Sequence, residues 1–200
     1  MVMMNHISSG ITNMNHVISN VLEYTKPRPA NLRRMDLHQV LREVLGFSRY
    51  MAEQNGVGFE EKLAKGEPTV RGDADQLRQV FQNMIQNAVQ AMTDGGTLRV
   101  STRIQPPPKG TRKGTDEARD DPPAPHGNVV VVFKDNGPGI PKDVQAQIFD
   151  PFFTTKARGT GLGLAIVHNI IESHEATIEV DSKPGKGTEF TFHFPLAGKG

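Results

Sequence analysis

The segment Gly159-Thr-Gly-Leu-Gly-Leu164 places three glycines two residues apart, directly before an apolar-periodic run that continues to about His174. Glycines let a backbone approach phosphates closely, and the start of the following helix directs free N–H groups at them. The spacing differs from the G-x-x-x-x-G-K-[ST] loop and from the G-x-G-x-x-G pattern. No strand precedes it; Phe152-Phe-Thr-Thr-Lys-Ala-Arg158 has instead the composition of a mobile lid. This segment therefore predicts a phosphate-binding site that is built by neither of these two loop types.

A second polar element lies upstream, on a helix that Asp73 would cap and that would run to about Met92. Asn83 and Asn87 are four residues apart and so share one face of this helix. Mg²⁺ prefers hard oxygen ligands, and an amide oxygen can serve beside waters and phosphates. Two buried amides that satisfy each other or the backbone would give the same pattern, so the helix alone leaves both interpretations open.

A third element, Asp135-Asn-Gly-Pro-Gly139, follows the apolar segment Asn128–Lys134, which reads as a buried strand. Asn-Gly is a common hairpin signal. Here, however, the chain continues through Pro141 into a helix predicted over Asp143–Phe149 rather than into a return strand. An Asp at a strand end, beside glycines that expose a flat apolar slot, can accept a hydrogen bond from a purine amine.

The order of helices and strands defines the fold class. Further helices are expected over 36–52 and 162–174, and further strands over 57–63, 69–71, 97–104, 177–181 and 188–194. Because these elements mix without a regular strand–helix–strand rhythm, we predict an α+β fold, a two-layer sandwich with one mixed sheet under one layer of helices. Residues 105–127 are rich in proline and mixed charge, which predicts a disordered loop between two strands.

A long N-terminal helix precedes this sandwich. Apolar residues from Met4 to Thr25 recur every three or four positions, and Pro27 and Pro29 end the pattern. One helix cannot bury such a stripe alone. A partner helix from another chain is the simplest solution, and packing on the chain's own domain is the alternative.

Composition excludes several classes of protein. The 200 residues suit one domain with an appendage, and a net charge of +1 gives no electrostatic footprint for nucleic acid. The sequence has no cysteine, so disulfides and thiolate metal sites are impossible. No apolar run has the length of a membrane span, and no signal peptide is visible.

Together these motifs resemble the catalytic, ATP-binding domain of two-component sensor histidine kinases, within the Bergerat-fold superfamily. Asn83-Met-Ile-Gln-Asn87-Ala resembles the N box, and Asp135-Asn-Gly-Pro-Gly139 the first glycine box. The F box, the second glycine box and the terminal glycine box have counterparts in Phe149-Asp-Pro-Phe152-Phe153, Gly159–Leu164 and Gly185-Lys-Gly-Thr188. The match spans roughly Asp36–Pro195 and is most similar to nitrogen-regulation-type kinases. Residues 1–30 would then be the second helix of the dimerisation hairpin, and 31–200 the ATP-binding domain.

The resemblance implies a role for each matching residue. Asn87 would be the Mg²⁺ ligand, and the catalytic residues would be Asn83, Asn87 and Lys156. ATP would be bound by Asp135 at the adenine amine, by Gly139 under the base and by Thr188 near it. Lys156 and Arg158 would be lid cations near the γ-phosphate. The other ATP-binding residues would be Gly137, Gly159, Thr160, Gly161, Leu162 and Gly163.

The resemblance also implies an activity, transfer of the γ-phosphoryl of Mg-ATP to a His on a dimerisation hairpin and then to an Asp of a response regulator. The hairpin and the response regulator would be partners, with a homodimer through the N-terminal helix and a cytoplasmic location, including as the cytoplasmic part of a membrane-anchored sensor. None of the seven His has the sequence context of the acceptor; His174-Glu175 has the dipeptide but ends the helix after the glycine box.

Two alternatives remain. One is an ATP-hydrolysing Bergerat-fold enzyme, such as a chaperone, a mismatch-repair factor or a type II topoisomerase; those proteins place a Glu where this chain has Asn83, and an amide is a poor general base. The other is a nucleotide-binding dimerisation module without kinase activity.

Overall fold

The computed structural model describes residues 21–22, 25, 28–107, 127–156 and 159–198. The predicted N-terminal helix over Met4–Thr25 and the predicted loop over 105–127 therefore lie largely outside the described residues, as does Arg158. The strands are β1 (Arg33–Asp36), β2 (Val57–Lys62), β3 (Thr69–Gly72), β4 (Gly96–Gln105), β5 (Asn128–Asp135), β6 (Thr177–Ser182) and β7 (Thr188–Pro195). The helices are α2 (Leu37–Gln54), α3 (Ala74–Ala91), α4 (Lys142–Gln145) and α5 (Gly163–Ser173).

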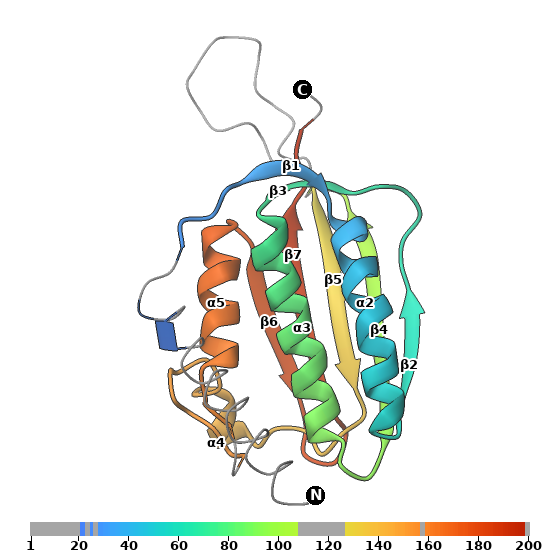
Figure 1. The fold of residues 1–200 in the computed structure, drawn as a ribbon, viewed down its shortest axis with the longest axis vertical. Coiled ribbons are helices and arrows are strands. Elements are labelled where there is room, and N and C mark those ends of the chain that lie inside the picture. The colour runs from blue at the N-terminus through green and yellow to red at the C-terminus, as the bar shows by residue number, and fades with distance from the viewer. Residues whose placement is uncertain (1–20, 23–24, 26–27, 108–126, 157–158, 199–200) are drawn as a thin grey trace, which may run out of the picture.

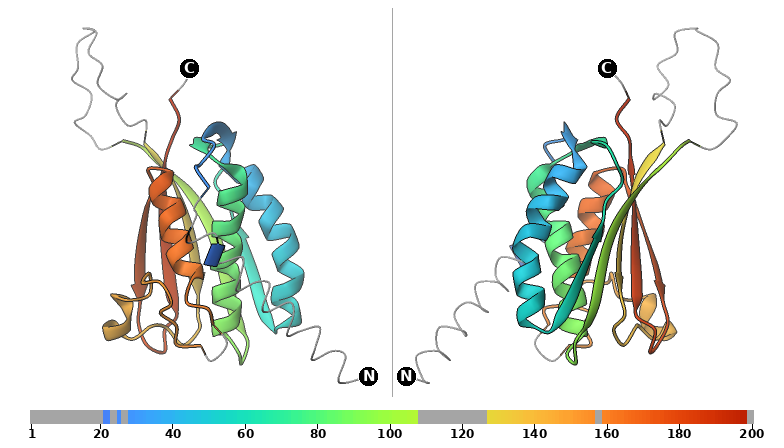
Figure 2. Two further views of the ribbon diagram at one scale, coloured as in Figure 1. Left: turned by 60° about the vertical axis from the view of Figure 1, so that its left-hand side comes forward. Right: turned by 90° about the vertical axis from the view of Figure 1, so that its right-hand side faces the viewer.

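The described residues form two layers. Five strands make one mixed sheet in the order β2-β4-β5-β7-β6, in which β2 and β4 are parallel and the other neighbours are antiparallel. Helices α2, α3 and α5 lie side by side over one face of this sheet (Figures 1 and 2). A small antiparallel pair, β1 with β3, crosses one end of the helices. The predicted two-layer α+β sandwich is confirmed.

The helix starts follow from the local sequence. The Asp36 carboxylate accepts from the His38 N–H at the start of α2, and the Asp73 carboxylate accepts from Asp75 N–H and Gln76 N–H at the start of α3. The apolar face of α3 is buried as its periodicity predicts, through Leu77, Val80, Phe81, Met84, Ile85, Ala88 and Val89. The ring of Phe81 lies 5.9 Å from that of Phe133 on β5, which joins helix layer to sheet.

The prediction for residues 143–149 is wrong in extent. Helix α4 covers only Lys142–Gln145, and turns follow it. The Gln145 side chain donates to Ile140 O at 2.7 Å and to Ser182 O at 2.9 Å. These contacts tie the segment to the end of β6, so its shape is set by a neighbour distant in sequence rather than by its own helical pattern.

The sheet brings the sequence motifs together at one end of the molecule. The last residue of β5, Asp135, lies beside the first residue of β7, Thr188, because these strands are antiparallel neighbours. The carboxyl end of α3 and the amino end of α5 reach the same end (Figure 1). Within the described residues, no helix combines the length and the apolar content that crossing a membrane requires.

Candidate nucleotide-binding site

A cavity of about 420 Å³ lies where these four elements meet. Ten residues that the sequence predicted for the site line it: Asn83, Asn87, Asp135, Gly139, Lys156, Gly159, Thr160, Gly161, Gly163 and Thr188. Gly137 and Leu162 are outside this lining, and Arg158 lies outside the described residues. Apolar side chains from α3, α4 and the sheet, including Met84, Val144 and Phe133, complete the wall. The cavity is therefore apolar on one side and polar at a few chosen points, as ligand sites usually are.

Asp135 is the acidic group of this cavity and is only 7% exposed. Its Oδ1 accepts from the backbone N–H of Gly137 at 2.9 Å and of Thr188 at 3.2 Å. Burial raises the pKa of the carboxyl above its ordinary value, and these two N–H donors act in the opposite direction. Because both bonds fall on Oδ1, Oδ2 is the oxygen that can accept from a ligand. Gly137 thus shapes the site through its N–H, not by lining the cavity.

Thr188 belongs to a hydroxyl pair that sequence reasoning missed. Its Oγ1 lies 2.9 Å from Ser182 Oγ, which donates to Gly187 O at 3.0 Å and accepts from Ile140 N–H at 2.8 Å. Since the Ser182 proton is directed to Gly187 O, the Thr188 hydroxyl donates to Ser182. The register of β6 against β7, in which Ser182 faces Thr188, creates this pair, and no sequence motif indicated it.

The fold explains why residue 139 is a glycine. Its φ is +72°, and a Cβ there would lie 2.1 Å from Lys183 O in the loop before β7. The loop after β5 can therefore approach the loop before β7 only without a side chain at this position. Gly139 itself lines the cavity.

The glycine-rich segment is folded back on the Phe residues before it. Phe152 N–H donates to Gly161 O at 3.0 Å, and a Cβ on Gly161, at φ +67°, would lie 2.3 Å from the carbonyl carbon of Phe152. The Phe152 side chain is 62% exposed, which excludes a core role for it, whereas Phe153 lines the cavity. The close turn places Gly159, Thr160 and Gly161 along the wall next to α3.

Lys156 reaches across the cavity to α3. Its Nζ donates to Asn87 Oδ1 at 3.1 Å and to Gln90 Oε1 at 2.8 Å, and burial lowers the pKa of this ammonium. The amide oxygen of Asn87 therefore points into the cavity and accepts from a cation, rather than pairing with Asn83. Gln90, three residues after Asn87 on the same face, is a site residue that the sequence analysis missed, although that spacing could have indicated it.

The same arrangement fits a divalent cation with oxygen ligands. Amide oxygens of Asn87 and Gln90 and the nearby Asn83 form a cluster without carboxylates, so phosphate oxygens would have to complete the coordination shell. Among the described residues, no group of three His, Asp or Glu side chains could hold a metal by itself. A metal here would depend on a phosphate-bearing ligand.

Comparison with known proteins agrees with this geometry. Residues 72–198 match the family of histidine kinase-, DNA gyrase B- and HSP90-like ATPases. Sporulation kinase A of Bacillus subtilis (strain 168) is 35% identical over 190 residues, which is 94% of this chain and 28% of that protein. The chain thus spans less than a third of the length of this relative.

Solved histidine kinase structures share the fold. The nucleotide-free catalytic domain of ThkA superposes with a TM-score of 0.65 at 26% identity over 83% of this chain and 96% of that chain. Full-length ShkA, solved in complex with AMPPNP, gives a TM-score of 0.71 at 26% identity, over 92% of this chain and 36% of that chain.

The fold and the site define an ATP-binding domain of the histidine kinase type. The chain belongs to the histidine kinase-, DNA gyrase B- and HSP90-like ATPase family, and its curated relatives include sensor histidine kinases. The resemblance predicted from the five sequence motifs is confirmed.

Proposed function

We propose that this chain binds Mg-ATP in the cavity between α3 and the glycine-rich segment and transfers the γ-phosphoryl group to a His on a dimerisation hairpin. A response-regulator Asp would be the next acceptor. The observation that supports this most directly is the pairing of Lys156 Nζ with the amide oxygen of Asn87 at the cavity wall. Lys156 and the metal ligand Asn87 would then both lie at the phosphate end of the nucleotide, and Asp135 would lie at its base end.

In this proposal the chain's residues hold and orient the nucleotide. Asp135 Oδ2 accepts from the adenine amine, and the apolar wall with Gly139 receives the base. Gly159, Gly161 and Gly163 offer backbone close to the phosphates at the start of α5. Asn87 holds Mg²⁺, which would neutralise charge on the phosphate oxygens, and Lys156 moves from its amide partners to the γ-phosphate.

Hydrolysis is a poorer fit to the site. Activation of a water molecule needs a base near the γ-phosphate, and the position one turn before Asn87 is Asn83, whose amide cannot accept a proton at neutral pH. We therefore propose that the site retains ATP until an external nucleophile arrives, with positioning as the main source of catalysis. The proposed homodimer through the N-terminal helix would bring that nucleophile.

A transfer experiment tests this proposal. The chain is incubated with Mg²⁺ and γ-labelled ATP, alone and with a separate hairpin bearing an acceptor His. We expect acid-labile label on the hairpin only, and its loss in the Lys156→Ala variant. Label on His6, His16 or His174 of the chain itself, or rapid phosphate release without the hairpin, would contradict the proposal. Tight nucleotide binding with no transfer to any hairpin would favour the dimerisation-module alternative.

A further inference from the structure

One side chain connects the segment 154–156 to helix α3. Lys156 Nζ donates to Asn87 Oδ1 at 3.1 Å and to Gln90 Oε1 at 2.8 Å, and we call these two hydrogen bonds the Lys156 latch. Asn87 and Gln90 are three residues apart on α3, so their amide oxygens lie on one face and hold one cation between them. In this structure that cation is the ammonium of Lys156.

The segment 154–156 depends on the latch for its position. The side chains of Thr154 and Thr155 are exposed. The Lys156 N–H donates to Thr154 Oγ1 at 3.1 Å, and Gly159 N–H donates to Lys156 O at 3.1 Å, so both of these bonds stay within the turn. Among the hydrogen bonds of the described residues, the two from Lys156 Nζ are the ones that join this segment to α3.

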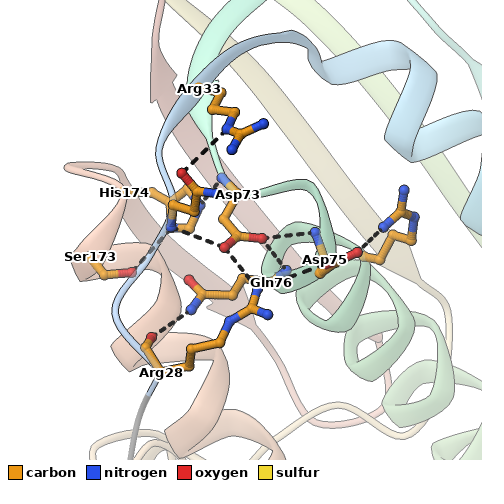
Figure 3. Close-up of polar contacts among 9 residues, drawn as sticks. Arg28, Arg33, Asp73, Asp75, Gln76, Ser173 and His174 are labelled. Carbon is orange, nitrogen blue, oxygen red and sulfur yellow. Dashed lines mark hydrogen bonds and ion pairs between the residues drawn. The ribbon is translucent and has the colours of Figure 1, made fainter.

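The helix on the other side of the latch is fixed at its start. Asp73 caps α3, and its Oδ2 accepts from Arg28 Nη2 at 3.0 Å (Figure 3). The Asp73 N–H donates to Nε2 of the buried His174 at 2.9 Å, at the end of α5. Because these contacts and the buried apolar face of α3 hold the helix, breaking the latch moves the segment of Lys156 and leaves the amides in place.

A divalent cation bound to the same amides would lie close to the ammonium. Mg²⁺ binds oxygen ligands at about 2.0–2.1 Å, and Lys156 Nζ lies 3.1 Å from Asn87 Oδ1. The two cations would then be no more than about 5.2 Å apart. Of the described residues that line the cavity, only Asp135 is acidic, and it belongs to β5. No carboxylate of α3 therefore offsets the repulsion between the two cations at this site.

We propose that Lys156 and Mg²⁺ compete for the amide oxygens of Asn87 and Gln90. The Lys156 ammonium holds these oxygens, and with them the segment 154–156, when no metal does, and it leaves them when a metal-bound nucleotide enters. The inference rests on the proposed function, because it takes Asn87 as the metal ligand. It adds that the metal, rather than the nucleotide alone, releases the segment and frees Lys156 for the terminal phosphate of a triphosphate.

Hydrogen exchange tests the latch without any nucleotide. Lys156→Met keeps a long side chain but removes the ammonium. The protection of the amides of residues 154–156 should fall roughly two- to tenfold in this variant, the range expected for the loss of one hydrogen bond. Lys62→Met, which removes an exposed lysine from the end of β2, is the matched control and should leave this protection unchanged. Equal protection in the native protein and Lys156→Met would overturn the latch.

Calorimetric titration with ADP tests the competition. ADP has no γ-phosphate, so the freed ammonium gains no terminal phosphate as a partner. The quantity compared is the ratio of the dissociation constant in EDTA to that in Mg²⁺. Metal binding must break the latch in the native protein but not in Lys156→Met, so this ratio should be roughly two- to tenfold larger in the variant. Lys62→Met should give the native ratio.

The outcomes separate this inference from the proposed function. If Lys156 only attracts phosphates, its loss would weaken ADP equally in EDTA and in Mg²⁺, and the unchanged ratio would overturn the competition while the nucleotide site stands. Exchange in the native protein gives a second criterion: Mg-ADP should lower the protection of residues 154–156, and ADP in EDTA should not. Failure of all three proteins to bind ADP would instead contradict the proposed function, and the exchange comparison without nucleotide would still decide whether the latch exists.

Discussion

Asp135 presents one carboxylate oxygen to the cavity while the other is held by two backbone N–H groups. In an Asp135→Asn variant these donors would select the amide oxygen and direct the NH₂ group at the ligand. A donor would then face the adenine amine, itself a donor. We expect ATP affinity to fall by roughly 1–3 kcal/mol, as for a lost buried hydrogen bond. Isothermal titration calorimetry on both proteins measures this change.

GTP provides the matched control for Asp135. Guanine has a carbonyl where adenine has its amine, so the native carboxylate should disfavour GTP. The NH₂ group of the variant can donate to that carbonyl, so the variant should bind GTP better than the native protein does. The preference for ATP over GTP should therefore shrink in Asp135→Asn. Equal ATP affinity in the two proteins would remove Asp135 from the adenine contact.

His174 makes the stability of the domain depend on pH. Burial lowers the pKa of this imidazole below its ordinary value near 6.5, although Ile170 O and Asp73 act in the opposite direction. The unfolded chain then binds the proton more readily than the folded one, so stability is complete above about pH 6.5 and falls as pH drops below it. Protonation also removes the Nε2 acceptor of Asp73 N–H.

Urea unfolding at pH 7.5 and pH 5.5 checks this expectation. The native protein should lose stability between these values, and His174→Gln should show a shallower loss because it has no group to protonate at this position. His38, which is also buried among the described residues, is present in both proteins. An identical pH dependence in both would show that His174 is not responsible.

At the scale of one element, α3 divides its functions between faces. Its apolar residues face the sheet, and Asn83, Asn87 and Gln90 line the cavity. The cap at Asp73 and the core contacts fix the position of the helix. The position of the helix in turn sets where its three side-chain amides lie. This arrangement explains why residues seven positions apart can act on one ligand.

Replacing Asn87 with Ala separates metal binding from nucleotide binding. If Asn87 Oδ1 binds Mg²⁺, the variant should bind nucleotide in EDTA nearly as the native protein does, yet gain little affinity when Mg²⁺ is added. Calorimetric titrations with and without Mg²⁺ measure the difference. Gln90→Ala removes the other partner of Lys156 and a more distant member of the same oxygen cluster, and should lose less of the metal dependence than Asn87→Ala. Unchanged metal dependence in Asn87→Ala would return Asn87 to a structural role.

At the scale of the whole molecule, the nucleotide would contact α3, the end of β5, the start of β7 and the glycine-rich segment together. A ligand held by all of them stabilises the folded state as a unit. At a concentration of one hundred times the dissociation constant the gain is about 2.7 kcal/mol. For a domain of this size, the melting temperature should then rise by roughly 5–10 °C.

Thermal unfolding followed by circular dichroism measures this effect. ATP with Mg²⁺ should raise the melting temperature, GTP at the same concentration should raise it much less, and Asp135→Asn should show a reduced response to ATP. An equal rise in melting temperature with ATP and with GTP would show that the phosphates alone supply the binding energy.

The sequence by itself determined the features whose causes are local. Asp36 and Asp73 cap helices through N–H groups two or three residues away, and the buried face of α3 follows from a period of 3.6 residues. The glycine pattern and the two asparagines identified the family for the same reason, since each motif is contiguous. Helix 143–149 was overextended because its length depends on Ser182, far along the chain.

Only the tertiary structure decided which of these motifs meet. Lys156 reaches Asn87 and Gln90 across 69 and 66 residues, and Asp73 reaches His174 across 101. The Ser182–Thr188 pair depends on strand register, and the ion pair of Arg28 with Asp73 depends on where α3 begins in space. Such contacts leave no periodic trace in a sequence, because the sheet order and the packing of helices on it bring the residues together.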